Sequence, residues 1–155
     1  MCRGKKAARP ISRAVVALAA VIGSLVVNPT GAGAAAEPQN VATRLIWNRS
    51  PAAASCIGEA ALARAVERRV GRPVFVPAAG ASLVIDGFAE RDQARGAWRA
   101  TLSLSVAGGA VLGRRALSIA APGCGPLGDM VVLTIALMIR DREASAADRH
   151  IHKNA

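Results

Sequence analysis

Residues 97–106 alternate strictly between apolar and polar side chains, and this alternation constrains the fold more than any other part of the chain. The apolar positions are Trp98, Ala100, Leu102, Leu104 and Val106, and the polar positions between them are Arg99, Thr101, Ser103 and Ser105. A period of two places successive side chains on opposite faces of a β-strand. The pattern therefore predicts a strand with one buried and one solvated face, as in an antiparallel sheet covered on one side.

The flanking segments predict two partners for this strand. Residues 82–89 have the composition of a strand, and residues 90–96 form the turn that joins them to it. On the other side, the pair Gly108-Gly109 supplies the positive φ angles that a two-residue hairpin loop needs. The chain then returns over residues 111–120, where Gly113 is typical of a β-bulge. These segments together predict a three-stranded antiparallel meander.

Two helices are predicted around the meander. Apolar residues recur at the three- and four-residue spacing of an amphipathic helix at Ile57, Ala61, Leu62, Ala65, Val66 and Val70. Ser55 is the expected N-cap, and Gly71 ends this helix. Residues 127–139 are apolar almost throughout; their β-branched content fits a strand, but their length favours a helix that begins near Pro126. The predicted fold class is α+β: helix, three-stranded antiparallel meander, helix, with the helices on one face of the sheet.

The first 36 residues have the layout of a secretory signal peptide. An uncharged apolar run, residues 14–27, leads to a small-residue site at Ala34–Ala36 and follows five cations, Arg3, Lys5, Lys6, Arg9 and Arg13. The run is shorter than the roughly 20 residues of a membrane-spanning helix, so we predict cleavage near Ala36, with an uncleaved anchor as the alternative. The expected location is the periplasm or the medium.

Cleavage at that site defines the expected organisation of the remaining chain. A mobile leader is predicted over residues 37–51, within which residues 44–47 could form a short strand or a segment packed on the domain edge. A single domain follows over residues 52–142, and a polar tail over residues 143–155. After the signal, the longest apolar run is Met130–Ile139, which is too short to span a bilayer as a helix.

The cysteines agree with export. Loss of the signal removes Cys2 and leaves Cys56 and Cys124, an even pair in an oxidising compartment. We therefore predict a disulfide between these two, with buried free thiols as the alternative. Both cysteines fall at or just before a predicted helix start, so the bridge would hold the two helix N-termini side by side. No metal site is expected, because His150 and His152 lie in the polar tail and no ligand stands at metal-binding spacing from either cysteine.

The charge narrows the classes of partner. The chain has a net charge of +10, and without the five signal cations it would be about +5, carried almost wholly by arginine. Such arginine content is typical of a GC-rich genome, and it also favours anionic partners such as lipid headgroups or envelope polymers. Nucleic acid is not expected, because no basic block with interleaved aromatic residues is present and export argues against it.

No catalytic constellation is recognisable, and no cofactor is predicted. A G-x-S-x-G nucleophile elbow is absent. Asp86, Glu90 and Asp92 could act as paired carboxylates, although the interleaved Arg91 and Arg95 favour a solvated turn.

The candidate interaction surface is the solvated face of the meander. Arg99, Thr101, Ser103 and Arg114 are expected to form a basic patch there, and Trp47 is a further candidate, either as a plug at the sheet edge or as a partner contact. We expect a small binding or assembly module of the cell envelope that works through this face or through an edge strand. The alternatives are a small envelope enzyme that uses acidic or arginine residues on a small ligand, and a basic domain that binds anionic envelope polymers.

Residues 52–139 contain a series of short motifs at loose spacing: Cys56, Leu62, Val66, Val70-Gly71-Arg72, Trp98-Arg99-Ala100-Thr101-Leu102, Gly113-Arg114-Arg115-Ala116-Leu117, Cys124 and Leu127. These motifs resemble those of a group of exported domains from myxobacteria and related bacteria. The resemblance implies an envelope or secreted location and carries no implication about catalysis.

Overall fold

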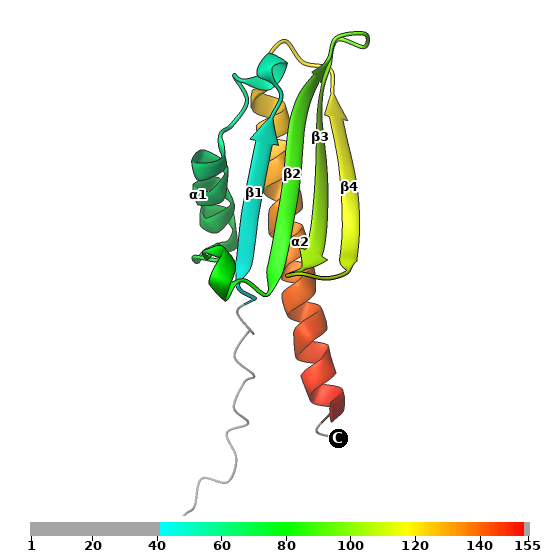
Figure 1. Cartoon of the computed structure of the whole chain (residues 1–155). Coiled ribbons are helices and arrows are strands. Elements are labelled where there is room, and N and C mark those ends of the chain that lie inside the picture. The colour runs from blue at the N-terminus through cyan, green and yellow to red at the C-terminus, as the bar shows by residue number, and fades with distance from the viewer. Residues whose placement is uncertain (1–40, 154–155) are drawn as a thin grey trace, which may run out of the picture. The chain divides into compact units, whose positions relative to one another are not determined.

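The computed structural model describes residues 41–153, and the predicted signal peptide lies outside them (Figure 1). Within this range two short 3-10 turns, η1 (Pro51–Ala53) and η2 (Ala78–Gly80), accompany the main elements. In chain order, the main elements are β1 (Thr43–Arg49), α1 (Glu59–Val70), β2 (Leu83–Asp92), β3 (Ala97–Val106), β4 (Val111–Ile119) and α2 (Gly125–Lys153).

The four strands form one mixed sheet in the order β1-β2-β3-β4. β1 runs parallel to β2, from Thr43↔Leu83 to Arg49↔Ala89, while the other two pairs are antiparallel. The α+β class is confirmed, but the predicted three-stranded antiparallel meander between two helices is wrong in strand number and in element order. The error lies at β1, which falls in the segment predicted as a leader. Its partner β2 lies beyond the whole of α1, and such non-local pairing leaves no local pattern in the sequence.

The predicted turns and bulge of the meander are present. Gly108 has a φ of 69° in the β3–β4 turn, a conformation that favours glycine, but Gly109 has no positive φ, so only one of the two predicted positive φ angles is present. Along β3 and β4 the register shifts between Leu104, which faces Gly113, and Ser105, which faces Val111. The extra residue on β4 is a β-bulge next to Gly113, as predicted.

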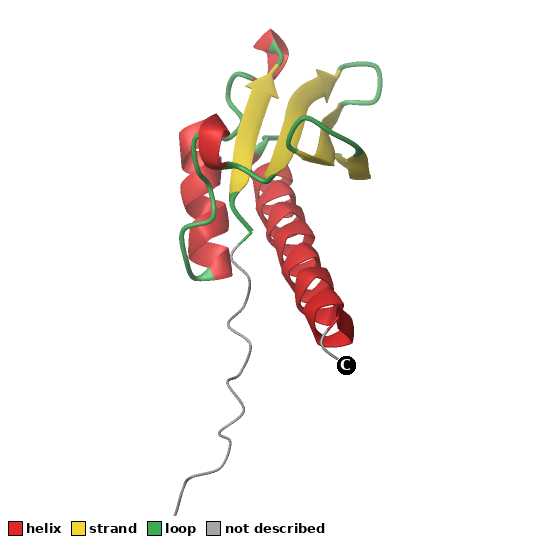
Figure 2. Cartoon of the chain, turned by 60° about the horizontal axis from the view of Figure 1, so that its bottom comes forward, coloured by secondary structure: helices red, strands yellow, loops and turns green. Residues whose placement is uncertain are grey.

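Both helices cover the same face of the sheet, and they contact each other (Figures 1 and 2). The core lies between the helices and that face. Fully buried side chains from α1, β2, β3 and α2 meet there, among them Leu62, Val66, Ile85, Leu102, Leu127, Val131, Ile135 and Ile139. Trp98 is only 7% exposed, as expected for the apolar face of its strand.

The helices differ from their predicted bounds at two of their four ends, since α2 begins at Gly125, next to the predicted start at Pro126. α1 begins at Glu59, with Gly58 rather than Ser55 as its N-cap, and it ends at Gly71, whose φ of 90° confirms the predicted C-cap. The last apolar segment is helical, and α2 continues through the region predicted as a polar tail as far as Lys153. Glu143 of this extension pairs with Arg72, just after α1. No helix within residues 41–153 is both long and apolar enough to cross a membrane.

Candidate interaction face of the sheet

The face of the sheet turned away from the helices is the candidate site, and we call it the open face. Each strand contributes alternate side chains to it, since the other positions point to the buried core. These side chains are Arg44, Ile46 and Asn48 from β1, Val84, Asp86, Phe88 and Glu90 from β2, Arg99, Thr101, Ser103 and Ser105 from β3, and Arg114, Ala116 and Ser118 from β4.

The strand register arranges the open face in rows across the sheet. One row is Ile46–Asp86–Ser103–Arg114, the next is Asn48–Phe88–Thr101–Ala116, and a third holds Glu90–Arg99–Ser118. The two predicted arginines therefore share the face but stand in different rows. Adjacent strands lie about 4.8 Å apart, which leaves neighbours in a row within reach of one partner group.

A shallow depression of about 490 Å³ lies on the open face over β2, β3 and β4. Three of the predicted site residues, Thr101, Ser103 and Arg114, line it together with Asp86. Within residues 41–153 none of these four side chains forms a hydrogen bond or ion pair with another protein group. Their polar atoms are thus free to bind a partner.

Arg99 lies on the same face but outside this depression. Its guanidinium group is 3.3 Å from the carboxylate of Asp92, which also accepts hydrogen bonds from the Arg95 backbone at 3.1 Å and the Arg95 side chain at 3.0 Å. The hydrogen bonds from Arg95 are the main reason that the pKa of Asp92 is lowered from its ordinary value of 3.8. The side chain of Arg99 therefore bonds to the β2–β3 turn and does not line the depression.

Trp47 does not belong to the open face. Its side chain is 6% exposed and faces the helices, and its indole N–H donates a hydrogen bond to the carbonyl of Ile57 at 2.8 Å. A role as an exposed partner contact is therefore excluded for this residue as the structure places it. The reason is the strand register, because it places Trp47 on the same side of the sheet as Ile85 and Leu102.

The acidic residues do not form the pair considered as a catalytic alternative. Asp86 lines the depression, whereas Glu90 lies four residues further along β2, about 13 Å away at the Cα level for a strand. Paired carboxylates of glycoside hydrolysis lie about 5–9.5 Å apart. In the part of the chain that the structure describes, no three His, Cys, Asp or Glu residues come together as metal ligands would.

Phe88 is a residue of the open face that the sequence interpretation missed. It is 39% exposed, and it stands between Asp86 and Glu90 along β2 and opposite Thr101 on β3. Its parity with Asp86 within the predicted strand already indicates the solvated side. A large aromatic side chain on a polar face is typical of protein interfaces.

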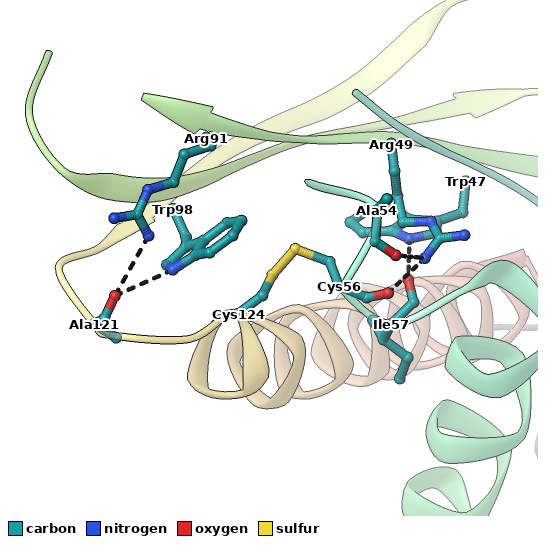
Figure 3. The surroundings of a disulfide bond; sticks show 9 residues. All are labelled: Trp47, Arg49, Ala54, Cys56, Ile57, Arg91, Trp98, Ala121 and Cys124. Atoms are coloured by element: carbon teal, nitrogen blue, oxygen red, sulfur yellow. Dashed lines mark hydrogen bonds between the residues drawn. A yellow bond between two sulfur atoms is a disulfide. The ribbon is translucent and has the colours of Figure 1, made fainter. Parts of the chain in front are cut away.

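A disulfide on the covered side of the sheet joins the segments that precede the two helices (Figure 3). Cys56 and Cys124 have Cα atoms 5.1 Å apart and are each 5% exposed. The predicted pairing is therefore present, and the bridge is buried. Cys56 comes shortly before α1 and Cys124 directly before α2, so the bond holds the two helix starts together.

Two tryptophans and two arginines fix the segments on either side of this bridge, as Figure 3 shows. The indole N–H of Trp98 donates to the carbonyl of Ala121 at 3.1 Å, and the Arg91 guanidinium lies over the Trp98 ring, 4.4 Å from its centroid. On the other side, Arg49 donates to the carbonyls of Ala54 and Cys56 at 2.7 and 2.6 Å. These contacts satisfy carbonyl groups in irregular backbone next to the core.

No protein-family model matches this chain, and no curated protein or solved structure is significantly similar to it. Its resemblance to exported myxobacterial domains stays a prediction.

Proposed function

We propose that this protein is a non-catalytic binding module of the cell envelope whose open face docks against another protein. The observation that carries the proposal is the depression lined by Asp86, Thr101, Ser103 and Arg114, next to exposed Phe88. No element within residues 41–153 covers this face (Figure 2). An exposed aromatic side chain surrounded by polar groups without internal partners is the composition of an interface core with a polar rim.

The charges of the open face favour a protein over an anionic polymer. Three arginines, Arg44, Arg99 and Arg114, share the face with two acids, Asp86 and Glu90. A surface that holds a polyanion is dominated by positive charge, because repulsion from carboxylates weakens binding. A face with both signs instead suits a folded partner with complementary charges.

Two features support a location in the envelope or the medium. The sequence of residues 1–36 predicts export. The Cys56–Cys124 bridge is of a kind that persists in oxidising compartments. Intact mass measured before and after reduction, with thiol alkylation, tests this location. We expect a chain that begins near Glu37 and gains two alkyl groups only after reduction; a full-length chain with freely alkylated thiols would contradict export.

Photo-crosslinking in intact cells tests the docking face. A photoreactive residue at Thr101 is expected to give a discrete protein adduct, whereas one at Arg64, exposed on α1, is expected to give none. Introducing Phe88→Ala should reduce the Thr101 adduct at least fivefold, because the aromatic contact is lost. Leu137→Ala, a matched change at a residue 51% exposed on α2, should leave it unchanged.

The same experiment distinguishes the alternatives. Equal adducts at both positions, or none at Thr101, would contradict docking through the open face. A heterogeneous polymer adduct that disappears at high salt would instead support the binding of an anionic envelope polymer.

A further inference from the structure

The two edges of the sheet differ in the groups that bond to them. At β1, the Thr43 N–H donates to the carbonyl of Val74 at 3.0 Å, and the Val76 N–H donates to the carbonyl of Thr43 at 2.9 Å. The Trp47 N–H is satisfied by the Glu59 carboxylate at 2.9 Å. At Thr43 and at the N–H of Trp47, the β1 edge is thus occupied by the chain itself. β4 is the opposite edge, and in Figure 1 no element lies beyond it.

The free edge of β4 is closed at only two carbonyls by side chains. Arg142 donates to Leu112 O at 3.2 Å, and Arg115 donates to Arg114 O at 2.9 Å. Backbone groups of alternate residues point away from the sheet along an edge strand, so Ala116 and Ser118 follow Arg114 in this direction. Among the described residues no side chain bonds to the backbone of these two. The last part of β4 therefore offers main-chain donors and acceptors to another strand.

The charge of this edge selects its occupant. β4 contains Arg114 and Arg115 and no acidic residue. A second copy paired through β4 would bring four guanidinium groups to one seam without a carboxylate on either strand, which is unfavourable. Asp141 lines the groove beside Arg115 and Arg142 but forms no ion pair with either. An acidic strand would supply the missing charge.

We propose that β4 accepts an extended acidic segment of a partner protein as a fifth strand. When the strand is added, one of its N–H groups donates a hydrogen bond to the carbonyl of Arg114 and replaces the Arg115 side chain there. The released Arg115 guanidinium then pairs with a carboxylate of the added strand. Arg114 points to the open face and Arg115 to the helix-covered side. Because consecutive side chains of a strand point to opposite faces, two adjacent acidic residues meet both arginines. This inference does not depend on docking through the open face.

A capped synthetic peptide with two adjacent glutamates, flanked on each side by valine and threonine, is the probe. Titrated into the isotope-labelled protein with its disulfide formed, it should bind saturably and slow hydrogen exchange of the Ala116 and Ser118 amides. The same peptide with lysines in place of the glutamates should bind with an affinity lower by a factor of about ten or more. Methylation of the backbone amides of the peptide that would face β4 should abolish binding, because the added strand then lacks hydrogen-bond donors.

Matched variants separate the charge from the edge. Arg115→Glu should weaken the glutamate peptide about tenfold and strengthen the lysine peptide, whereas Arg64→Glu, the same charge change on α1, should do neither. Equal binding of the methylated peptide, or no saturable binding at millimolar concentration, would overturn the proposal. Protection of the Ala116 and Ser118 amides by self-association, without peptide, would make a second copy the occupant and would also overturn it. Spectral changes centred on Phe88 and Thr101 would assign the peptide to the open face instead.

Discussion

Gly87 lies against the indole ring of Trp47, its partner across the parallel β1–β2 pair. A Cβ built on Gly87 would be 2.6 Å from Trp47 Cε3 and 2.8 Å from Leu102 Cδ2. The ring therefore fills the space that a side chain on β2 would need. This packing places the tryptophan in the core and lets its N–H reach Ile57 beside the disulfide.

Gly87→Ala should destabilise the protein by about 1–3 kcal/mol, because the added methyl group overpacks the space held by Trp47 and Leu102. Urea unfolding, followed by tryptophan fluorescence, measures this loss. Gly113→Ala is the control, since a Cβ there meets nothing within 4 Å. The control should change stability by less than about 0.5 kcal/mol. Equal losses of stability in the two variants would show that the close packing of the Trp47 ring against Gly87 does not require a glycine.

Removal of the disulfide should cost up to about 4 kcal/mol, since the bridge closes a segment with a sequence separation of 68. The comparison is between the oxidised protein and the double variant Cys56→Ala, Cys124→Ala in urea unfolding. A reducing agent should lower the unfolding midpoint of the native protein and leave that of the variant where it is. A midpoint of the native protein that does not respond to full reduction would contradict a stabilising role of the bridge.

Glu67 is expected to hold the chain where it returns from α1. Its carboxylate oxygen Oε1 accepts the backbone N–H of Val74 at 3.1 Å and of Phe75 at 3.2 Å. Glu67→Ala leaves both donors without this partner and should cost about 1–3 kcal/mol in chemical unfolding. Glu67→Gln keeps an oxygen acceptor at the same place and should lose less than half as much. The idea fails if the glutamine variant is as unstable as the alanine variant.

Asp92 should make stability depend on acid pH. Its pKa is lowered in the folded protein, chiefly by the hydrogen bonds from Arg95, so the folded state favours the charged form. The stabilisation is fully present above the ordinary value of 3.8 and is lost as the pH falls through the lowered pKa. Unfolding midpoints measured between about pH 5 and pH 2 should therefore fall less steeply in Asp92→Asn than in the native protein. Identical slopes would count against this contribution.

Several elements could be predicted because their signals are local. The alternation over residues 97–106 places Thr101 and Ser103 on the solvated face, where they line the depression. The terminating Gly71 also lies where its sequence signal indicates. For residues 127–139 the local pattern was ambiguous between strand and helix. The segment is a helix, and it is buried against both the sheet and α1.

The candidate site was predicted only in part, and the reasons are tertiary. Arg99 has the predicted face but is held by Asp92 of the adjoining turn. Trp47 was considered as a partner contact, but it lies on the covered face, opposite Gly87. Asp86 joins Ser103 and Arg114 in one row, which depends on the register of three strands.

The sequence by itself determined the α+β class, the β3–β4 hairpin with its bulge, the end of α1 and the cysteine pair, because each depends on residues close in the chain or on a simple count. Only the tertiary structure decided that β1 joins the sheet parallel to β2, that Trp47 is buried, and that β4 remains a free edge. Those features arise from pairing between segments far apart in the chain, whose register is set by packing of the whole core.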